Sequence, residues 1–190
     1  MYQKYQTEGI VLGERHNGEA DKTVILYTRD FGLVYARATG VRKESSKMRY
    51  AVQCYARANV SLVRGKRGWR LAGATALANA CTDFDLVRTF ARISELVLRL
   101  VVGEEENIYL FEALSQAHDA LMGANVEAAP MIEIVAVARI LYALGYLSAE
   151  ALETALFTHT MYAQVHLREA ETMREELLSS INRALSGTHL

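Results

Sequence analysis

The clearest chemical signal in this chain is a basic segment from Thr39 to Tyr50, which holds four cations among twelve residues. A glycine and two serines accompany these cations, which favours a loop over a helix or a strand. Clustered Lys and Arg side chains neutralise phosphate groups, so the segment predicts binding to the backbone of a nucleic acid. The four cations are Arg42, Lys43, Lys47 and Arg49.

Charge is divided unequally along the chain. Residues 1–75 hold 14 Lys and Arg against 6 Asp and Glu, a net charge of +8, whereas residues 76–190 hold 7 against 16, a net charge of −9. The whole chain has a net charge of only −1. Such asymmetry indicates that one half meets a polyanion and the other does not.

Aromatic residues lie between the cations of the basic half. Cations follow the phosphates of a single strand while aromatic faces stack on its bases, so this mixture predicts single-strand binding without sequence discrimination. The alternative is that Lys and Arg only keep the domain in solution, and that Trp69 and most tyrosines fill its core. The predicted DNA contacts are Arg15, Lys22, Arg37, Arg42, Lys43, Lys47, Arg49, Arg64, Lys66, Arg67 and Tyr35.

Motifs that would carry catalysis or hold a cofactor are missing from the sequence. It has no Gly-x-x-x-x-Gly-Lys phosphate loop, no Gly-x-Ser-x-Gly elbow and no His-Glu-x-x-His metal motif. Five histidines are scattered without ligand spacing, and Cys54 and Cys81 stand alone as two reduced thiols. We therefore expect no catalytic residue, no metal and no cofactor.

Alternating apolar and polar residues predict five strands in the basic half, which would position the cations. The third predicted strand precedes the basic segment and the fourth follows it, so the segment should project from a small sheet. Five strands in about 75 residues without a long helix are typical of an OB-fold barrel. The predicted strands are Thr7–Arg15, Lys22–Thr28, Leu33–Thr39, Ala51–Arg64 and Trp69–Ala76.

The acidic half has helical periodicity throughout. Its predicted helices begin near Thr82, Asn107, Pro130, Ser148 and Tyr162. The fold class is therefore α+β, with an OB-fold domain at residues 1–78 and an all-α domain for partner docking at residues 79–190. No apolar run is long enough for a bilayer span and the N-terminus lacks the apolar core of a secretory signal, so we expect a cytoplasmic protein without membrane contact.

Several short motifs in the basic half together resemble the RecO family of bacterial recombination mediators. The motifs keep the family's order and spacing over about 70 residues, and a helix ending in Leu144-Gly145-Tyr146 resembles the family more loosely. The N-terminal motifs are Thr7-Glu8-Gly9-Ile10-Val11-Leu12, Gly18-Glu19-Ala20-Asp21, Leu26 to Gly32, Gly40-Val41-Arg42-Lys43 and Ser46-Lys47-Met48-Arg49.

The resemblance implies a non-catalytic mediator of DNA repair located at the bacterial nucleoid. It implies binding of single- and double-stranded DNA, annealing of complementary strands, and partnership with RecR and single-stranded DNA-binding protein to help load RecA. Many members carry a cysteine zinc site after Leu-Gly-Tyr, but residues 147–160 contain no cysteine, so zinc is not expected.

The helical domain of this family receives the apolar, acidic tail of single-stranded DNA-binding protein. Arg139, flanked by apolar residues, is the candidate contact for that tail. An alternative is an internal ion pair with Glu133 or Glu95. Two other functions also stay open, namely an RNA-binding OB module and an adaptor whose basic half binds an acidic protein.

Overall fold

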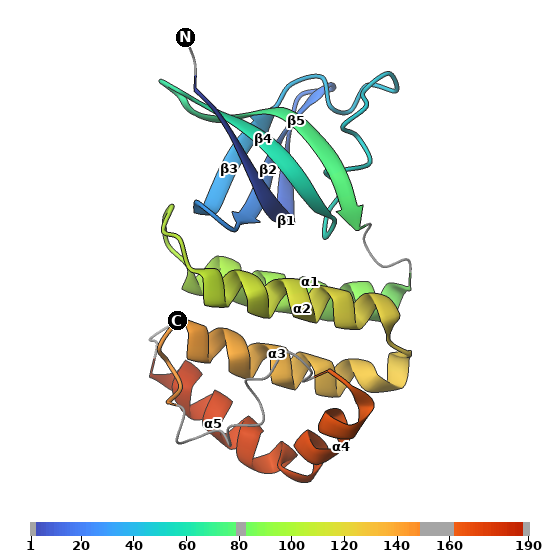
Figure 1. Ribbon diagram of the computed structural model, residues 1–190, viewed down its shortest axis with the longest axis vertical. Coiled ribbons are helices and arrows are strands. Elements are labelled where there is room, and N and C mark those ends of the chain that lie inside the picture. Colours follow the sequence, from blue (N-terminus) through green and yellow to red (C-terminus); the bar gives the residue numbers. More distant parts are fainter. Residues whose placement is uncertain (1–2, 79–82, 149–161, 188–190) are drawn as a thin grey trace. The chain divides into compact units, whose positions relative to one another are not determined.

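The computed structural model describes residues 3–78, 83–148 and 162–187. The chain forms two compact units, which are described separately (Figure 1). The barrel unit contains residues 1–82 and 100–111, and the helical unit contains residues 83–99 and 112–190. The short segment at residues 100–111 therefore belongs to the barrel unit although it follows a helix of the other unit.

Five strands of the barrel unit close into a barrel in the order β1-β2-β3-β5-β4, which confirms the predicted OB-fold (Figure 1). Pairing is antiparallel except between β3 and β5, which run parallel. The strands are β1 (Lys4–Asn17), β2 (Asp21–Thr28), β3 (Gly32–Ala38), β4 (Arg57–Gly65) and β5 (Gly68–Ala78).

The barrel core follows from the alternation of side chains along each strand. In β3, Val34, Ala36 and Ala38 are fully buried whereas Tyr35 and Arg37 point to solvent, as the sequence predicts. Val24, Leu26, Val60 and Leu62 from neighbouring strands complete the same cluster, together with Val41 and Val52 from the loop between β3 and β4. The loop is therefore fixed to the barrel by apolar contacts at both ends.

The predicted strand Ala51–Arg64 was too long at its start. Residues 51–55 form turns, and β4 begins only at Arg57. Tyr55 has a φ of +67°, which a strand cannot accommodate, and its N–H donates to Val11 O at 2.8 Å. Val52 and Ala56 are buried as the alternation predicts, because an apolar turn packed on a barrel end buries the same residue types as a strand.

The segment at residues 100–111 contacts the barrel strands through backbone and side chains. The Tyr27 hydroxyl lies 3.5 Å from Asn107 O, and Arg64 forms an ion pair with Glu104. Gly32 has a φ of +62°, and a Cβ there would collide with Glu105 O. The turn between β2 and β3 therefore requires glycine for its conformation and for the close approach of this segment.

Within the helical unit, whose helices are drawn in Figure 1, α1, α2 and α3 contribute most of the buried residues among those that the structure describes. Phe90 of α1 meets His118 of α2 edge to face, with ring centroids 5.3 Å apart. Arg92 of α1 forms a bidentate ion pair with Glu133 of α3. The helices are α1 (Phe84–Leu100), α2 (Ile108–Gly123), the 3-10 turn η1 (Val126–Ala128), α3 (Ala129–Ala143), α4 (Gln164–Thr172) and α5 (Arg174–Ser186).

Two predicted helix starts are confirmed by capping. The Asn107 side chain accepts a hydrogen bond from Leu110 N at 3.0 Å, and Pro130 lies in the first turn of α3. The prediction of one last helix from about Tyr162 to Leu185 was wrong, because the backbone at Met173 leaves the helical conformation and separates α4 from α5. Thr82, and the body of the short helix predicted from Ser148, lie outside the described residues. No helix in the described part of the chain is both long and apolar enough to span a bilayer.

Candidate nucleic-acid interface

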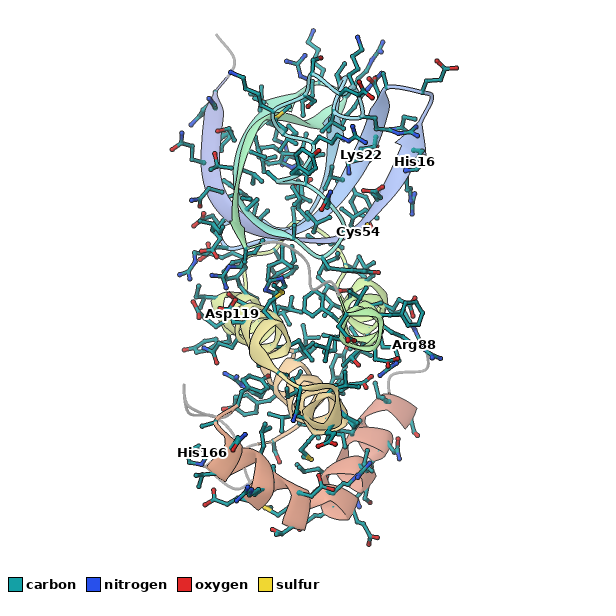
Figure 2. All side chains as sticks on the ribbon, turned by 90° about the vertical axis from the view of Figure 1, so that its right-hand side faces the viewer. His16, Lys22, Cys54, Arg88, Asp119 and His166 are labelled. Carbon is teal, nitrogen blue, oxygen red and sulfur yellow. The ribbon has the colours of Figure 1, made fainter. Side chains whose placement is uncertain are left out.

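Lys22 of β2 lies inside the barrel unit rather than on its surface. Its Nζ lies 2.5 Å from Glu14 Oε2 and donates to Val52 O at 2.7 Å, and its side chain is only 8% exposed. Figure 2 shows Lys22, His16 and Cys54 on the barrel. The ammonium group thus links two strands to the loop between β3 and β4. We exclude Lys22 from the interface, because a buried, paired ammonium cannot reach a phosphate.

Glu14 is the partner that makes the burial of Lys22 possible. Burial by itself would raise the pKa of Glu14, but the Lys22 ammonium and the His16 ring, 3.0 Å away, together hold that pKa below its ordinary value. The carboxylate therefore stays charged at neutral pH. Burial also raises the pKa of the nearby Cys54 thiol to about 11, and the negative charge of Glu14 raises it further.

The start of the loop is held by a second carboxylate, Asp21. Its Oδ1 accepts from Gly40 N at 2.8 Å and its Oδ2 from Arg37 Nη2 at 3.0 Å. The Gly40 N–H first, and the Arg37 guanidinium second, lower the pKa of Asp21. Arg42 adds a bond from its Nη1 to Gly18 O at 2.8 Å. The loop therefore leaves β3 in a defined direction.

The four loop cations are all exposed, but they do not share one surface. Arg42 and Arg49 line a pocket of about 340 Å³ together with Glu14 and Glu19. Lys47 borders a different and larger groove. The loop therefore presents positive charge in two directions, and the acids reduce it on one side.

A second group of cations surrounds the hairpin between β4 and β5. Arg37 of β3, Lys66 and Arg67 of the turn and Arg70 of β5 line a cleft of about 390 Å³ with no acidic residue in its lining. We call the cleft that these four cations line the hairpin cleft. Three of its cations were predicted contacts. Arg70 was not among them, although its outward position in the alternation of β5 could have identified it.

The remaining predicted cations have partners of their own. Arg64 forms its ion pair with Glu104, and its guanidinium lies 4.9 Å from the Trp69 ring centroid. Arg15 lies over the exposed ring of Tyr35, at 5.9 Å. An Arg stacked on an exposed tyrosine remains accessible, so Arg15 and Tyr35 can act together on a strand.

The aromatic residues divide between core and surface. Trp69 is 5% exposed and packs on Tyr5 and Phe31, with ring centroids 5.5 and 5.3 Å away, and Tyr27 is fully buried. Tyr35 and Tyr50 are 46% and 67% exposed. Tyr35 and Tyr50 therefore have the accessibility that base stacking requires, as has Tyr109 of the segment 100–111, which is 75% exposed.

Arg139 of α3 packs against Tyr162, with its guanidinium 5.7 Å from the ring centroid. Its Nη1 atom is buried, as is the Tyr162 hydroxyl. Burial raises the pKa of Tyr162 to about 12, and Arg139 acts in the opposite direction. Glu133, one of the two partners predicted for Arg139, is instead paired with Arg92. No group of three or more His, Cys, Asp or Glu side chains suited to a metal occurs among residues 3–78, 83–148 and 162–187.

A closed five-stranded barrel of this order defines the N-terminal part of the chain as an OB-fold domain. Comparison with known proteins shows which family this domain resembles. Residues 1–77 match the family described as "Recombination protein O N terminal". These residues are thus similar to the N-terminal domain of the RecO family, and the resemblance predicted from the sequence is confirmed.

Relatives of the chain include proteins named "DNA repair protein RecO" from several bacteria. The protein of Gloeothece citriformis is 30% identical over 119 residues, which is 61% of this chain and 42% of that protein. The protein of Pelotomaculum thermopropionicum is 32% identical over 126 residues, 65% of this chain and 49% of that protein. The chain spans about half the length of the curated relatives it matches.

Proposed function

We propose that this chain is a non-catalytic DNA-binding mediator of DNA repair. The hairpin cleft carries the proposal, because four cations from three parts of the barrel line one cleft without an acidic neighbour in its lining. Such a site suits the phosphates of a nucleic acid. The names of the relatives, all DNA repair proteins, favour DNA as the polyanion.

Binding would proceed through phosphates and would not depend on base sequence. The hairpin cleft provides Arg37, Lys66, Arg67 and Arg70, and the loop adds its four exposed cations. The exposed tyrosines Tyr35 and Tyr50 would stack on unpaired bases, which duplex DNA does not offer. Single strands would therefore bind more tightly than duplexes at equal salt.

Two separate groups of cations would also allow two strands to bind at once. The hairpin cleft and the pocket of Arg42 and Arg49 have no lining residue in common. Each group would neutralise one strand and so reduce the repulsion between complementary strands. This arrangement supports strand annealing, which a fluorescence transfer assay with labelled complementary oligonucleotides would measure.

Partner docking is proposed for the helical unit, with RecR, single-stranded DNA-binding protein and, indirectly, RecA as the partners. A groove of about 460 Å³ lies between the end of α3 and α5, lined by Tyr146, Leu147 and Arg183 among others. A cation beside apolar side chains suits an acidic, apolar peptide tail. The half-buried guanidinium of Arg139, packed on Tyr162, is a weaker choice.

The test is fluorescence anisotropy with a labelled 30-nucleotide strand at several salt concentrations. In the variant Lys66→Ala/Arg67→Ala we expect binding to weaken for every base sequence, and the slope of log affinity against log salt to fall by about 1 per cation removed. The matched control is Arg88→Ala/Arg99→Ala, which removes two exposed cations from the helical unit. Equal affinity and slope for the hairpin variant and the parent protein would refute the proposal.

Two competing functions make different predictions in the same assay. An RNA-binding module would prefer an RNA oligonucleotide over DNA of the same sequence. An adaptor for an acidic protein would bind DNA and RNA only weakly. Its salt slope would be the same in the hairpin variant and in the parent protein. Competition between the two oligonucleotides therefore separates all three functions.

A further inference from the structure

The outer edge of β5 is unpaired over most of its length. β3 pairs with β5 only at Ala36 with Trp69 and Arg37 with Arg70, whereas β5 continues to Ala78 on β4. Within residues 3–78, 83–148 and 162–187, no strand pairs with that edge beyond Arg70. An edge of this kind presents a row of free backbone N–H and C=O groups.

The parity of the strand pairing shows which residues face outward. Val11 exchanges backbone bonds with Ala56 and Tyr55, and Glu8 O accepts from Arg29 N, so odd-numbered residues of β1 face β4. Thr7 is the partner of Val60, which therefore bonds toward β1.

Ala74 is the partner of Val60 on the other side of β4. Because Val60 bonds toward β1, the pair Val60 and Ala74 is not hydrogen-bonded, and the N–H and C=O of Ala74 face away from β4. Gly9 is the partner of Ala58, and Ala58 is the partner of Ala76. By the same argument, the N–H and C=O of Ala76 also face away from β4.

A groove of about 810 Å³ borders this edge. Residues 72–75 of β5 line it together with Gly40 and residues 46–48 of the loop, and it continues over residues 6–8 of β1 and 59–61 of β4. The β5 side chains are small, so a second backbone can approach within pairing distance. The edge also has no charge and no proline from Leu71 to Ala78, the devices that usually prevent such pairing.

The charges around the groove select its occupant. Two charged residues line it, Lys47 and Glu8. Glu8 is offset by an ion pair with Arg57 at 3.0 Å, whereas no ion pair of Lys47 occurs in the described part of the chain. The surrounding residues 1–75 carry a net charge of +8, which opposes edge-to-edge pairing of two copies of this barrel and attracts an acidic segment.

We propose that the outer edge of β5 accepts an extended, acidic peptide segment of a partner protein as an additional antiparallel or parallel strand. Main-chain hydrogen bonds to Ala74 and Ala76 give the affinity, and Lys47 selects for carboxylate side chains. Lys47 serves both this site and the DNA contacts proposed above, whereas the backbone pairing at Ala74 and Ala76 belongs to this site alone, so the proline variants test it separately.

The test uses the full chain and a fluorescein-labelled octapeptide of alternating valine and aspartate, measured by anisotropy. We expect Ala74→Pro to weaken binding at least about fivefold, since the ring removes one outward donor. Ala74→Val keeps the N–H and is the matched control. Ala76→Pro repeats the test at an exposed position, with Ala76→Val beside it, and Trp69 fluorescence checks that each variant is folded.

Two altered peptides test the same contacts from the other side. A peptide with N-methylated valines should bind at least about tenfold more weakly, because it loses several donors at once. A peptide with asparagine in place of aspartate should weaken binding about as much as Lys47→Ala does.

Each remaining outcome overturns the proposal. No binding of the aspartate peptide at about 1 mM, or equal binding by the proline variants and the parent, would do so. A loss of oligonucleotide binding alone in Ala74→Pro would assign the edge to nucleic acid. A dimer that forms in sedimentation experiments and is lost in Ala74→Pro would assign it to a second copy.

Discussion

Replacing Lys22 with methionine separates two roles for this residue, phosphate contact and internal tether. The variant loses a charge-assisted bond to Glu14 and a bond to Val52 O, each worth about 1.5–3 kcal/mol before compensation. It also leaves the Glu14 carboxylate without its main partner. Removing one member of a fully buried pair costs about 3–5 kcal/mol. Because the Glu14 side chain is 25% exposed, we expect a loss of about 2–3 kcal/mol in unfolding free energy.

Urea unfolding followed by the fluorescence of Trp69, the single tryptophan, measures this loss. The midpoint should fall by about 1–2 M. Lys43→Met removes an exposed loop cation and is the matched control, with an expected change within about 0.5 kcal/mol. The double variant Glu14→Gln/Lys22→Met should recover part of the loss, because no unpaired carboxylate remains. A Lys22→Met protein with the parent's midpoint and a smaller salt slope for DNA would refute the reasoning.

Three further predictions concern the same unit. The pKa of Glu14 is lower in the folded than in the unfolded chain, so its contribution to stability is present above about pH 4.5 and is lost as the pH falls through the lowered pKa. The difference in urea midpoint between the parent and Glu14→Gln should therefore shrink between pH 6 and pH 3. Gly32→Ala should lower the unfolding free energy by about 2–4 kcal/mol, from its positive φ and the collision with Glu105 O, whereas Gly18→Ala, also at positive φ but in open space, should cost only about 1 kcal/mol. Cys54, with a pKa raised to about 11, should react slowly with iodoacetamide at pH 8 in a Cys81→Ser background, and its rate should rise with pH up to about 11; a rate equal to that of the urea-unfolded chain would contradict its burial.

Strand positions in the barrel follow closely from the sequence, because a half-buried strand alternates polar and apolar residues. The exception is instructive. Residues 51–55 continue the alternation of β4 but form turns, since Tyr55 adopts a positive φ and bonds to Val11. A strand and a turn packed on the barrel bury the same apolar residues here, so the sequence pattern alone does not distinguish the two conformations.

The break between α4 and α5 is a similar case. Both helices keep a helical pattern, and no Pro or Gly separates them. Met173 N bonds to Ala170 O three residues earlier, which tightens the last turn of α4 and lets the chain change direction. Leu177 and Ile181 of α5 are buried after the break, which leaves no mark in the local composition.

By itself the sequence determined the barrel, the helical half, the division of charge between them and the relation to the RecO family. It also identified the basic loop. Tertiary structure alone decided which cations remain available. Glu14 forms an ion pair with Lys22, Asp21 pairs with one nitrogen of Arg37, and Glu104 pairs with Arg64. These partners lie 8, 16 and 40 residues away along the chain, and an ion pair depends on distance through space, which no local pattern records.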